Sequence, residues 1–277
     1  MKLLRVGAPG AEKPAILAAD GSIRDLSATV HDFDAATLSP GGLERLAQLD
    51  PMSLPVAAPG RIGPCVPRPL NFICIGLNYA DHAAETGAAI PKEPIVFLKS
   101  LGAFCGPNDD VHIPRGSTKT DWEVELCIVI GSRASYVSEA GAMDHVAGYC
   151  IVNDVSEREY QIERGGTWDK GKGCDTFGPT GPWLVTKDEV PDPQKLAMFL
   201  DVDGKRMQTG STATMIFGVA KLVSYVSHFM TLHPGDLIST GTPPGVGLGM
   251  KPPVYLHAGQ TMRLGIAGLG EQTQRVR

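Results

Sequence analysis

The sequence lacks any run of about 20 apolar residues, the length that a membrane-spanning helix needs. Its first residues, MKLLRVGAPG, also lack the apolar segment of a secretion signal. Internal repeats and low-complexity segments are missing from the 277 residues. These absences predict a cytoplasmic protein without a membrane partner, and the length suffices for one or two domains.

Long stretches of lysine or arginine are also missing, and the net charge is −5. Nucleic acid is therefore not an expected partner. The glycine-rich stretch GTPPGVGLG, residues 241–249, lacks the Gly-Lys-Ser/Thr of a phosphate-binding loop, which argues against nucleotide binding. The six cysteines include no Cys-x-x-Cys pair, so we interpret them as reduced, mostly buried thiols.

The sequence does contain many glycines and prolines, 33 and 22 residues, between short β-branched runs. This composition favours a fold rich in strands and loops. A proline-rich connector at 51–69 predicts a boundary near residue 66, with a small domain over 1–66 and a larger one over 67–277. The predicted strands are a meander at 1–30, single strands at 71–80, 94–100, 121–131, 146–156, 181–186 and 236–243, and final strands at 253–259 and 260–270. A hairpin is predicted at 197–210 around Asp203-Gly204. The predicted helices are at 35–50, 81–87 and 211–233.

The segment DWEVELCIVIG, residues 121–131, places two glutamates inside an otherwise apolar strand. Side chains two residues apart share one face of a strand, so Glu123 and Glu125 lie together while Val124 points to the opposite face. Two like charges on a half-buried face repel each other and lose hydration. A bound cation would offset this cost.

A third carboxylate, Asp154, follows the next predicted strand. Neighbouring strands lie about 4.8 Å apart, so Asp154 and the two glutamates can converge on one ion. Oxygen ligands without His or Cys favour a hard cation, Mg²⁺ before Mn²⁺ or Ca²⁺. The spacing supports equally well the alternative that these acids only pair with Arg158, Lys170 or Lys172.

Five motifs follow one another along the chain. They are Asn78-Tyr79-x-x-His82-x-x-Glu85, Glu123-x-Glu125, Asn153-Asp154-x-x-x-Arg158-x-x-Gln161, Lys172-Gly-x-Asp175-Thr-x-Gly-Pro179, and Gly235-Asp236 followed by STGTPPGVG at 239–247. In this order and spacing the chain resembles the fumarylacetoacetate hydrolase family over roughly residues 68–277. Each motif alone is weakly specific, and their combination carries the resemblance. The segment before residue 66 resembles the small N-terminal extension of many bacterial members.

The resemblance implies an α+β, mostly β fold: a mixed β-roll with a small N-terminal α+β domain. It also implies a homodimer, a divalent metal and a 2-oxo acid substrate. By the matching motifs, the metal ligands would be Glu123, Glu125 and Asp154. The catalytic residues would be His82 and Glu85, which activate water, and Lys172, which stabilises an oxyanion. The substrate-binding residues would be Arg158, Gln161, Thr242, Gly241 and Asn78.

These residue types suit hydrolysis of a C–C bond in a 2,4-dioxo acid, which yields pyruvate and a carboxylic acid. Cleavage leaves negative charge on the pyruvate part, which Mg²⁺ stabilises, while an imidazole is a suitable base for water at neutral pH. On a helix His82 and Glu85 face the same way, although such a pair alone is more often an exposed surface pair. The substrate would be an acylpyruvate or a 2,4-dioxo-3-deoxy sugar acid, as in carbohydrate or aromatic catabolism.

Other activities fit the same resemblance. A 2-oxo acid decarboxylase, isomerase or hydratase, or a ureidoglycolate lyase, would use the same metal chelate. A non-catalytic binding protein is disfavoured, because every matched catalytic position is filled. The group beyond C4 of the substrate is not set by the motifs, and the segments ETGAAIPKEP (85–94) and ERGGTW (163–168) are candidates for its lining.

Overall fold

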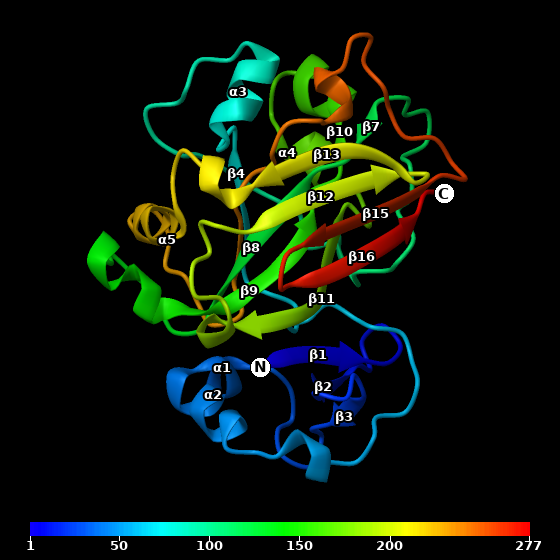
Figure 1. Cartoon of the computed structure of the whole chain (residues 1–277). Coiled ribbons are helices and arrows are strands. Elements are labelled where there is room, and N and C mark those ends of the chain that lie inside the picture. Colours follow the sequence, from blue (N-terminus) through cyan, green and yellow to red (C-terminus); the bar gives the residue numbers. More distant parts are fainter.

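The computed structural model describes residues 1–277, apart from the side chain of Thr86. Its centre is one mixed sheet with the strand order β3-β2-β1-β11-β9-β8-β14-β4-β5, and β6 lies beside β11 (Figure 1). β4 and β14 pair in parallel, as do β6 and β11, and the other neighbours are antiparallel. The strands are β1 (Lys2–Val6), β2 (Lys13–Leu17), β3 (Ile23–Asp25), β4 (Phe72–Gly76), β5 (Ile95–Leu98), β6 (Phe104–Cys105), β8 (Val124–Ile130), β9 (Val146–Asn153), β11 (Gly178–Thr186) and β14 (Leu237–Ser239). The predicted mostly β fold is confirmed.

A second, antiparallel sheet has the order β13-β12-β15-β16. Its strands are β12 (Ala197–Val202), β13 (Lys205–Ser211), β15 (Thr261–Ile266) and β16 (Gly270–Arg275), and a short pair joins β7 (Thr120–Asp121) to β10 (Ser156–Glu157). The predicted hairpin is confirmed: Asp203 and Gly204 have φ of 50° and 77°, as a tight two-residue turn requires. The predicted strand at 253–259 is wrong, since these residues form a loop.

The helices are short: α1 (Ala35–Leu38), α2 (Pro40–Ala47), α3 (Ala80–Thr86), α4 (Asp169–Lys172) and α5 (Val219–Ser227). The single helix predicted at 35–50 is divided at Ser39, whose hydroxyl accepts a hydrogen bond from Gly42 N (3.1 Å) and starts α2, with Pro40 at the first position. α3 ends, as predicted, at Gly87 in the left-handed conformation. Among the described residues no helix is long and apolar enough to cross a membrane.

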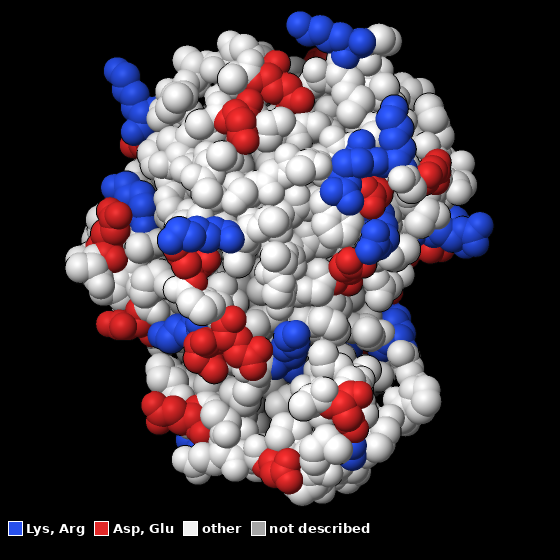
Figure 2. Space-filling view, in the orientation of Figure 1, with Lys and Arg blue, Asp and Glu red and all other residues white. Residues whose placement is uncertain are grey.

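Strand β8 is buried on both faces, and its alternating side chains enter two different cores. One face, with Val124, Leu126, Ile128 and Ile130, packs in the core that the second sheet covers. The other, with Cys127 and Val129, packs in a core shared with N-terminal residues such as Leu3 and Leu38. The predicted alternation is confirmed, but the face that carries the glutamates is fully buried rather than half-buried, because β1–β3, α1 and α2 extend the sheet and its core. Acidic and basic side chains are interspersed over the face of the molecule in Figure 2.

Candidate active site

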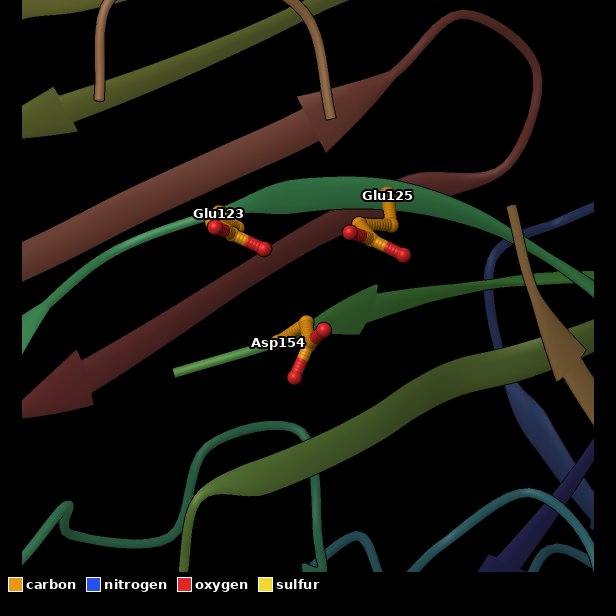
Figure 3. A group of neighbouring side chains, drawn as sticks. All are labelled: Glu123, Glu125 and Asp154. Carbon is orange, nitrogen blue, oxygen red and sulfur yellow. The ribbon is translucent and has the colours of Figure 1, made fainter. Parts of the chain in front are cut away.

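Three buried carboxylates converge at the ends of β8 and β9, as the sequence predicts. Glu123 directly precedes β8, Glu125 lies on it, and Asp154 directly follows β9. Antiparallel pairing brings these ends together, and Asp154 N donates a hydrogen bond to the Glu123 carbonyl (2.9 Å). One oxygen of each carboxylate lies within 4.8 Å of the other two (Figure 3).

Buried cations surround these acids. Of the ion-pair partners that the sequence offered as an alternative, Arg158 and Lys172 pair with them, whereas Lys170 Nζ donates to the Arg164 carbonyl. Lys172 Nζ donates to Glu123 Oε2 (2.7 Å) and to Asp154 Oδ2 (2.9 Å). Lys99 Nζ lies 2.6 Å from Asp154 Oδ1. Sequence reasoning missed Lys99, although a lone lysine at the end of the apolar strand IVFL was a signal. The basic stretch around Lys172 alone predicts a solvated turn, whereas the side chain is buried.

The charges fix the protonation of two of these groups. Burial alone would raise the pKa of Glu123, but the Lys172 and Arg158 charges outweigh it and lower the pKa to about 2. Burial alone would lower the pKa of Lys172, but Asp154 and Glu123 outweigh it and raise the pKa. Both effects favour the charged form of Lys172, which donates hydrogen bonds to the two carboxylates.

Glu125 behaves in the opposite way. Burial first, then the neighbouring Asp154 and Glu123 charges, raise its pKa well above the usual range. Ser239 Oγ (2.6 Å) and Gly241 N (2.9 Å) donate to its Oε2. A carboxylate destabilised by two like charges is one that a cation would stabilise. The all-oxygen donor set thus fits a hard divalent metal held by the three carboxylates.

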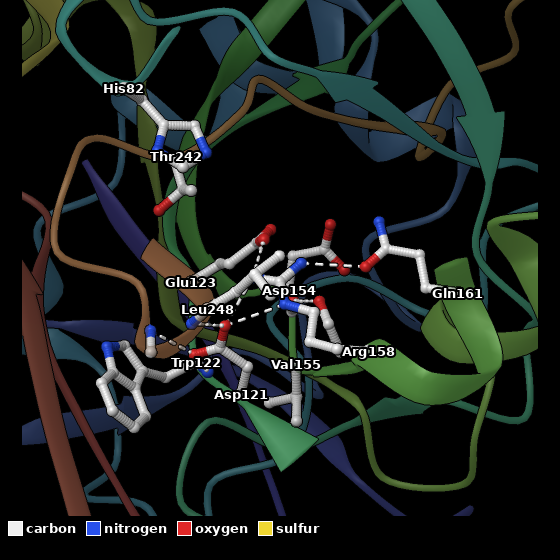
Figure 4. Close-up of polar contacts among 12 residues, drawn as sticks. His82, Asp121, Trp122, Glu123, Asp154, Val155, Arg158, Gln161, Thr242 and Leu248 are labelled. Carbon is white, nitrogen blue, oxygen red and sulfur yellow. Dashed lines mark hydrogen bonds and ion pairs between the residues drawn. The ribbon is translucent and has the colours of Figure 1, made fainter. Parts of the chain in front are cut away.

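Arg158 joins these acids to a carboxylate that the sequence motifs do not include, Asp121. Its Nε donates to Asp121 Oδ2 (2.8 Å), its Nη1 to Gln161 Oε1 (2.9 Å) and its Nη2 to Glu123 Oε1 (2.7 Å) (Figure 4). The guanidinium thus faces protein acceptors, and the amide of Gln161 lies at the cavity. Asp121 also accepts hydrogen bonds from Gly247 N (2.7 Å) and Leu248 N (3.0 Å). It thereby connects Arg158 to the glycine-rich loop.

His82 reaches the same cavity from α3. Its Nδ1 lies 3.1 Å from Glu85 Oε2, one helical turn further on. Glu85 also accepts from Gly245 N (3.0 and 3.2 Å). The pair is therefore held between the helix and the glycine-rich loop, and is not an exposed surface pair.

The remaining predicted residues divide into two groups. Gly241 and Thr242 line the cavity, and the Thr242 hydroxyl donates to the Val124 carbonyl (2.9 Å). Asn78 is fully buried, and its amide contacts Phe217 and Thr240 instead. It supports the loop that bears Gly241 and Thr242.

The cavity has a volume of about 150 Å³. Its polar lining consists of the three carboxylates, His82, Arg158, Gln161, Lys172, Gly241 and Thr242. Its apolar lining consists of Ile75, Leu77, Phe97, Ile162, Trp168 and Leu248. Of the two candidate segments for the substrate lining, 163–168 supplies Trp168, whereas no residue of 85–94 lines the described cavity. One small cavity thus brings together three carboxylates that could hold a metal, the ammonium group of Lys172 and the imidazole of His82.

Comparisons with known proteins identify the family to which the chain is similar. A family described as "Fumarylacetoacetate (FAA) hydrolase C-terminal" matches residues 71–277. A Burkholderia multivorans protein, whose name assigns it only provisionally as a hydrolase, is 66% identical over 279 residues, covering 100% of this chain and 99% of its own. The fumarylacetoacetate hydrolase from Exiguobacterium antarcticum superposes with a TM-score of 0.89 at 34% identity, covering 100% of this chain and 99% of that chain. A probable 2-hydroxyhepta-2,4-diene-1,7-dioate isomerase from Mycobacterium abscessus gives a TM-score of 0.85 at 32% identity, covering 100% and 98%.

Proposed function

Because the chain belongs to the fumarylacetoacetate hydrolase family, we propose that it is a divalent-metal-dependent hydrolase that cleaves a C–C bond in a 2,4-dioxo acid. The products would be pyruvate and a carboxylic acid. The observation that supports this proposal most is that His82 lines the same cavity as the three carboxylates, while Glu85 lies behind it, 3.1 Å from its Nδ1. Glu123, Glu125 and Asp154 would hold the metal, with Mg²⁺ or Mn²⁺ preferred by their oxygen donors. A bound divalent cation would supply Lewis-acid stabilisation of the negative charge on the 2-oxo acid part.

The residues of the chain would activate water and direct it to C4. Since Nδ1 of His82 faces Glu85, the imidazole would accept the proton of water at Nε2, and the carboxylate would stabilise the resulting imidazolium. The ammonium group of Lys172 would donate to the C4 oxygen as negative charge develops there. The C3–C4 bond then breaks with its electron pair on C3, which takes up a proton and becomes the methyl group of pyruvate. The oxygen of water stays in the carboxylic acid.

The experiment that tests this proposal is turnover of acetylpyruvate in water labelled with ¹⁸O. Hydrolysis predicts equal amounts of pyruvate and acetate, with one label in the acetate carboxylate. Release of neither product, or acetate without the label at early times, would refute the hydrolytic mechanism.

A second candidate is an isomerase of an unsaturated 2-oxo acid. The likeness to the Mycobacterium abscessus structure favours it, because that structure is named as such an isomerase and covers the whole chain. Isomerisation moves a proton and needs no attacking water, so it predicts neither pyruvate nor label in the product. The decarboxylase, hydratase and lyase alternatives are distinguished in the same assays by release of CO₂, by addition of water without cleavage, or by turnover of ureidoglycolate.

The family resemblance also supports a homodimer. Size-exclusion chromatography with light scattering, which measures the molar mass in solution, would test this. A mass near 29.3 kDa in solution would contradict it.

A further inference from the structure

The cavity of the candidate active site has an apolar end, and its chemistry bears on the substrate. Phe97 and Trp168 form an aromatic wall there, and Ile162 and Leu248 lie at the same cavity. Resting on the proposed function above, we propose that this end binds an uncharged, apolar acyl group. The substrate is then an acylpyruvate with an aliphatic or aromatic acyl part, and not a dicarboxylic or sugar-derived dioxo acid.

The aromatic wall begins next to the cation that would face the C4 oxygen. Lys172 Nζ lies 5.4 Å from the centre of the Phe97 ring. The Phe97 and Trp168 rings meet edge to face, with centroids 5.3 Å apart and an interplanar angle of 66°. A substrate whose C4 oxygen contacts Lys172 therefore extends its acyl group along these rings.

The backbone on both sides of the Trp168 indole fixes the position of the ring. Trp168 is the residue before α4, the helix that ends at Lys172, so the ring and the ammonium group are set by one short element. On the other side the indole packs on Gly76, where an added Cβ would lie 2.3 Å from Trp168 Cζ3. Only glycine admits the ring at this distance, and the wall is therefore a fixed surface for an apolar group.

The nearby cations already have hydrogen-bond partners within the protein. Every nitrogen of the Arg158 guanidinium donates to a protein acceptor, and Lys172 Nζ donates to two carboxylates. His82 has its own carboxylate partner in Glu85. The exposed Arg164 pairs with Glu159 and does not line the cavity.

A second carboxylate on the substrate would therefore lose its hydration against aromatic rings without a counter-charge from the described lining. The hydroxyl groups of a sugar-derived acid would likewise lose hydrogen bonds to water that this end does not replace. An alkyl or aryl group instead gains from leaving water. The same surface thus selects for one substrate class and against two others.

The test uses two dioxo acids with the same carbon chain: 2,4-dioxoheptanoate, which ends in a methyl group, and 2,4-dioxoheptanedioate, which ends in a carboxylate. We expect kcat/KM for pyruvate release to be higher for the monoacid by about 10-fold or more, the size of discrimination that an apolar pocket achieves. Equal values, or a preference for the dioate, would overturn the inference.

A binding experiment separates this inference from the proposed reaction. The uncleavable acids 2-oxoheptanoate and 2-oxoheptanedioate are titrated calorimetrically into the wild-type protein with Mg²⁺. Tighter binding of the monoacid supports the inference even if neither dioxo acid is cleaved, in which case only the proposed reaction fails. Equal binding, tighter binding of the dioate, or no binding of either acid overturns it.

Variants test whether the aromatic wall of Phe97 and Trp168 causes the preference for the monoacid. Trp168→Ala should lower kcat/KM for 2,4-dioxoheptanoate about 10-fold more than for acetylpyruvate, whose acyl group is too short to cover the indole. Ile162→Lys, at a half-exposed position of the rim, should raise the relative affinity for 2-oxoheptanedioate. Phe229→Ala removes an exposed aromatic side chain that does not line the cavity and serves as the control, with both ratios unchanged. Unchanged ratios in Trp168→Ala would place the specificity elsewhere and overturn this assignment.

Discussion

Glu85 accepts a hydrogen bond from the backbone N–H of Gly245 while its Oε2 lies 3.1 Å from His82 Nδ1. One carboxylate thus fastens α3 to the glycine-rich loop and orients the imidazole. The glycine-rich loop also packs closely on the Glu85 side chain, because a Cβ added to Gly249 would lie 2.9 Å from Glu85 Cδ. The position of α3 and the orientation of His82 are therefore coupled.

This coupling predicts the effect of Glu85→Gln. The amide oxygen can still accept from Gly245, so α3 should stay in place, but the charge that stabilises the imidazolium is lost. We expect kcat to fall by less than the roughly 10²–10⁴-fold that a general base contributes. Hydrogen exchange of α3 should change little in Glu85→Gln and become faster in Glu85→Ala. A kcat equal to that of the wild type in both variants would contradict the assigned role.

His82→Ala tests the proposed base itself. We expect kcat for hydrolysis to fall by roughly 10²–10⁴-fold, while Mg²⁺ and oxalate binding by calorimetry and the melting temperature stay close to wild type. His257→Ala, at an exposed position outside the cavity, is the matched control. Near-normal hydrolysis by His82→Ala would refute the water-activation mechanism and leave the metal site unaffected.

The N-cap of α1 predicts a pH-dependent stability effect far from the site. Asp34 Oδ1 accepts a hydrogen bond from Thr37 N (2.9 Å), and this bond lowers the pKa of Asp34 in the folded state. The stabilisation is therefore fully present above the unfolded-state pKa and is lost as the pH falls through the folded-state value. Asp34→Ala should lower the free energy of unfolding by about 1 kcal/mol at pH 7 and by less at pH 3.

Urea denaturation at the two pH values measures this difference. Asp34→Asn is the control, because asparagine caps a helix about as well without titrating. Its stability relative to the wild type should therefore rise as the pH falls. A deficit of Asp34→Ala that is the same at both pH values would contradict the charged cap.

Local pattern was sufficient to predict the elements that hold the carboxylates. The alternation through residues 124–130 predicted two faces, and both are present in β8. It failed where burial is not periodic: the predicted strand at 253–259 contains the apolar residues Val254, Tyr255 and Leu256, but these form part of a loop. Only Leu256 is buried, and its N–H donates to the Thr120 carbonyl as an isolated contact. The predicted helix at 211–233 likewise begins only at Val219, because residues 212–214 form a separate turn capped by Ser211.

The candidate site shows the same limit. Strand periodicity predicted that the three carboxylates would converge, and the family resemblance supplied the other candidate residues. Lys99 and Asp121 belong to neither group, because they contribute through contacts with segments far away in the sequence. Lys99 contacts Asp154, and Asp121 contacts Gly247 and Leu248. Spacing along the chain carries no information about such pairs. These contacts are set by the tertiary fold, in which Lys99 follows β5 and Asp121 ends β7.

The acidic centre predicts a strict metal requirement. Excess chelator should abolish turnover, and Mg²⁺ or Mn²⁺ should restore it. Glu123→Gln or Asp154→Asn should weaken calorimetric Mn²⁺ binding by more than the roughly 10- to 100-fold that loss of an outer partner costs. Glu163→Gln, an exposed acid outside the cavity, should leave Mn²⁺ binding unchanged. Full activity in excess chelator would contradict the proposed metal site.

Asp121 provides the last prediction, because it connects Arg158, and through it the three carboxylates, to the glycine-rich loop. Asp121→Asn leaves the buried Arg158 with one charged partner fewer. It also places an amide NH₂ group against Arg158 Nε or Gly247 N, which are themselves donors. Breaking a buried pair in this way costs about 3–5 kcal/mol, so the free energy of unfolding should fall by an amount of that order. Since Arg158 also donates to Glu123, Mn²⁺ affinity should fall as well, by roughly 10- to 100-fold.

The matched control for this prediction is Asp109→Asn. Asp109 pairs with Arg61 outside the cavity, with both side chains partly exposed. Its loss should lower stability less and leave Mn²⁺ affinity unchanged. If Asp121→Asn lowered stability but bound Mn²⁺ like the wild type, Asp121 would be a structural residue only. A loss of affinity confined to Asp121→Asn would identify it as the residue that positions Arg158, and through Arg158 the Glu123 carboxylate.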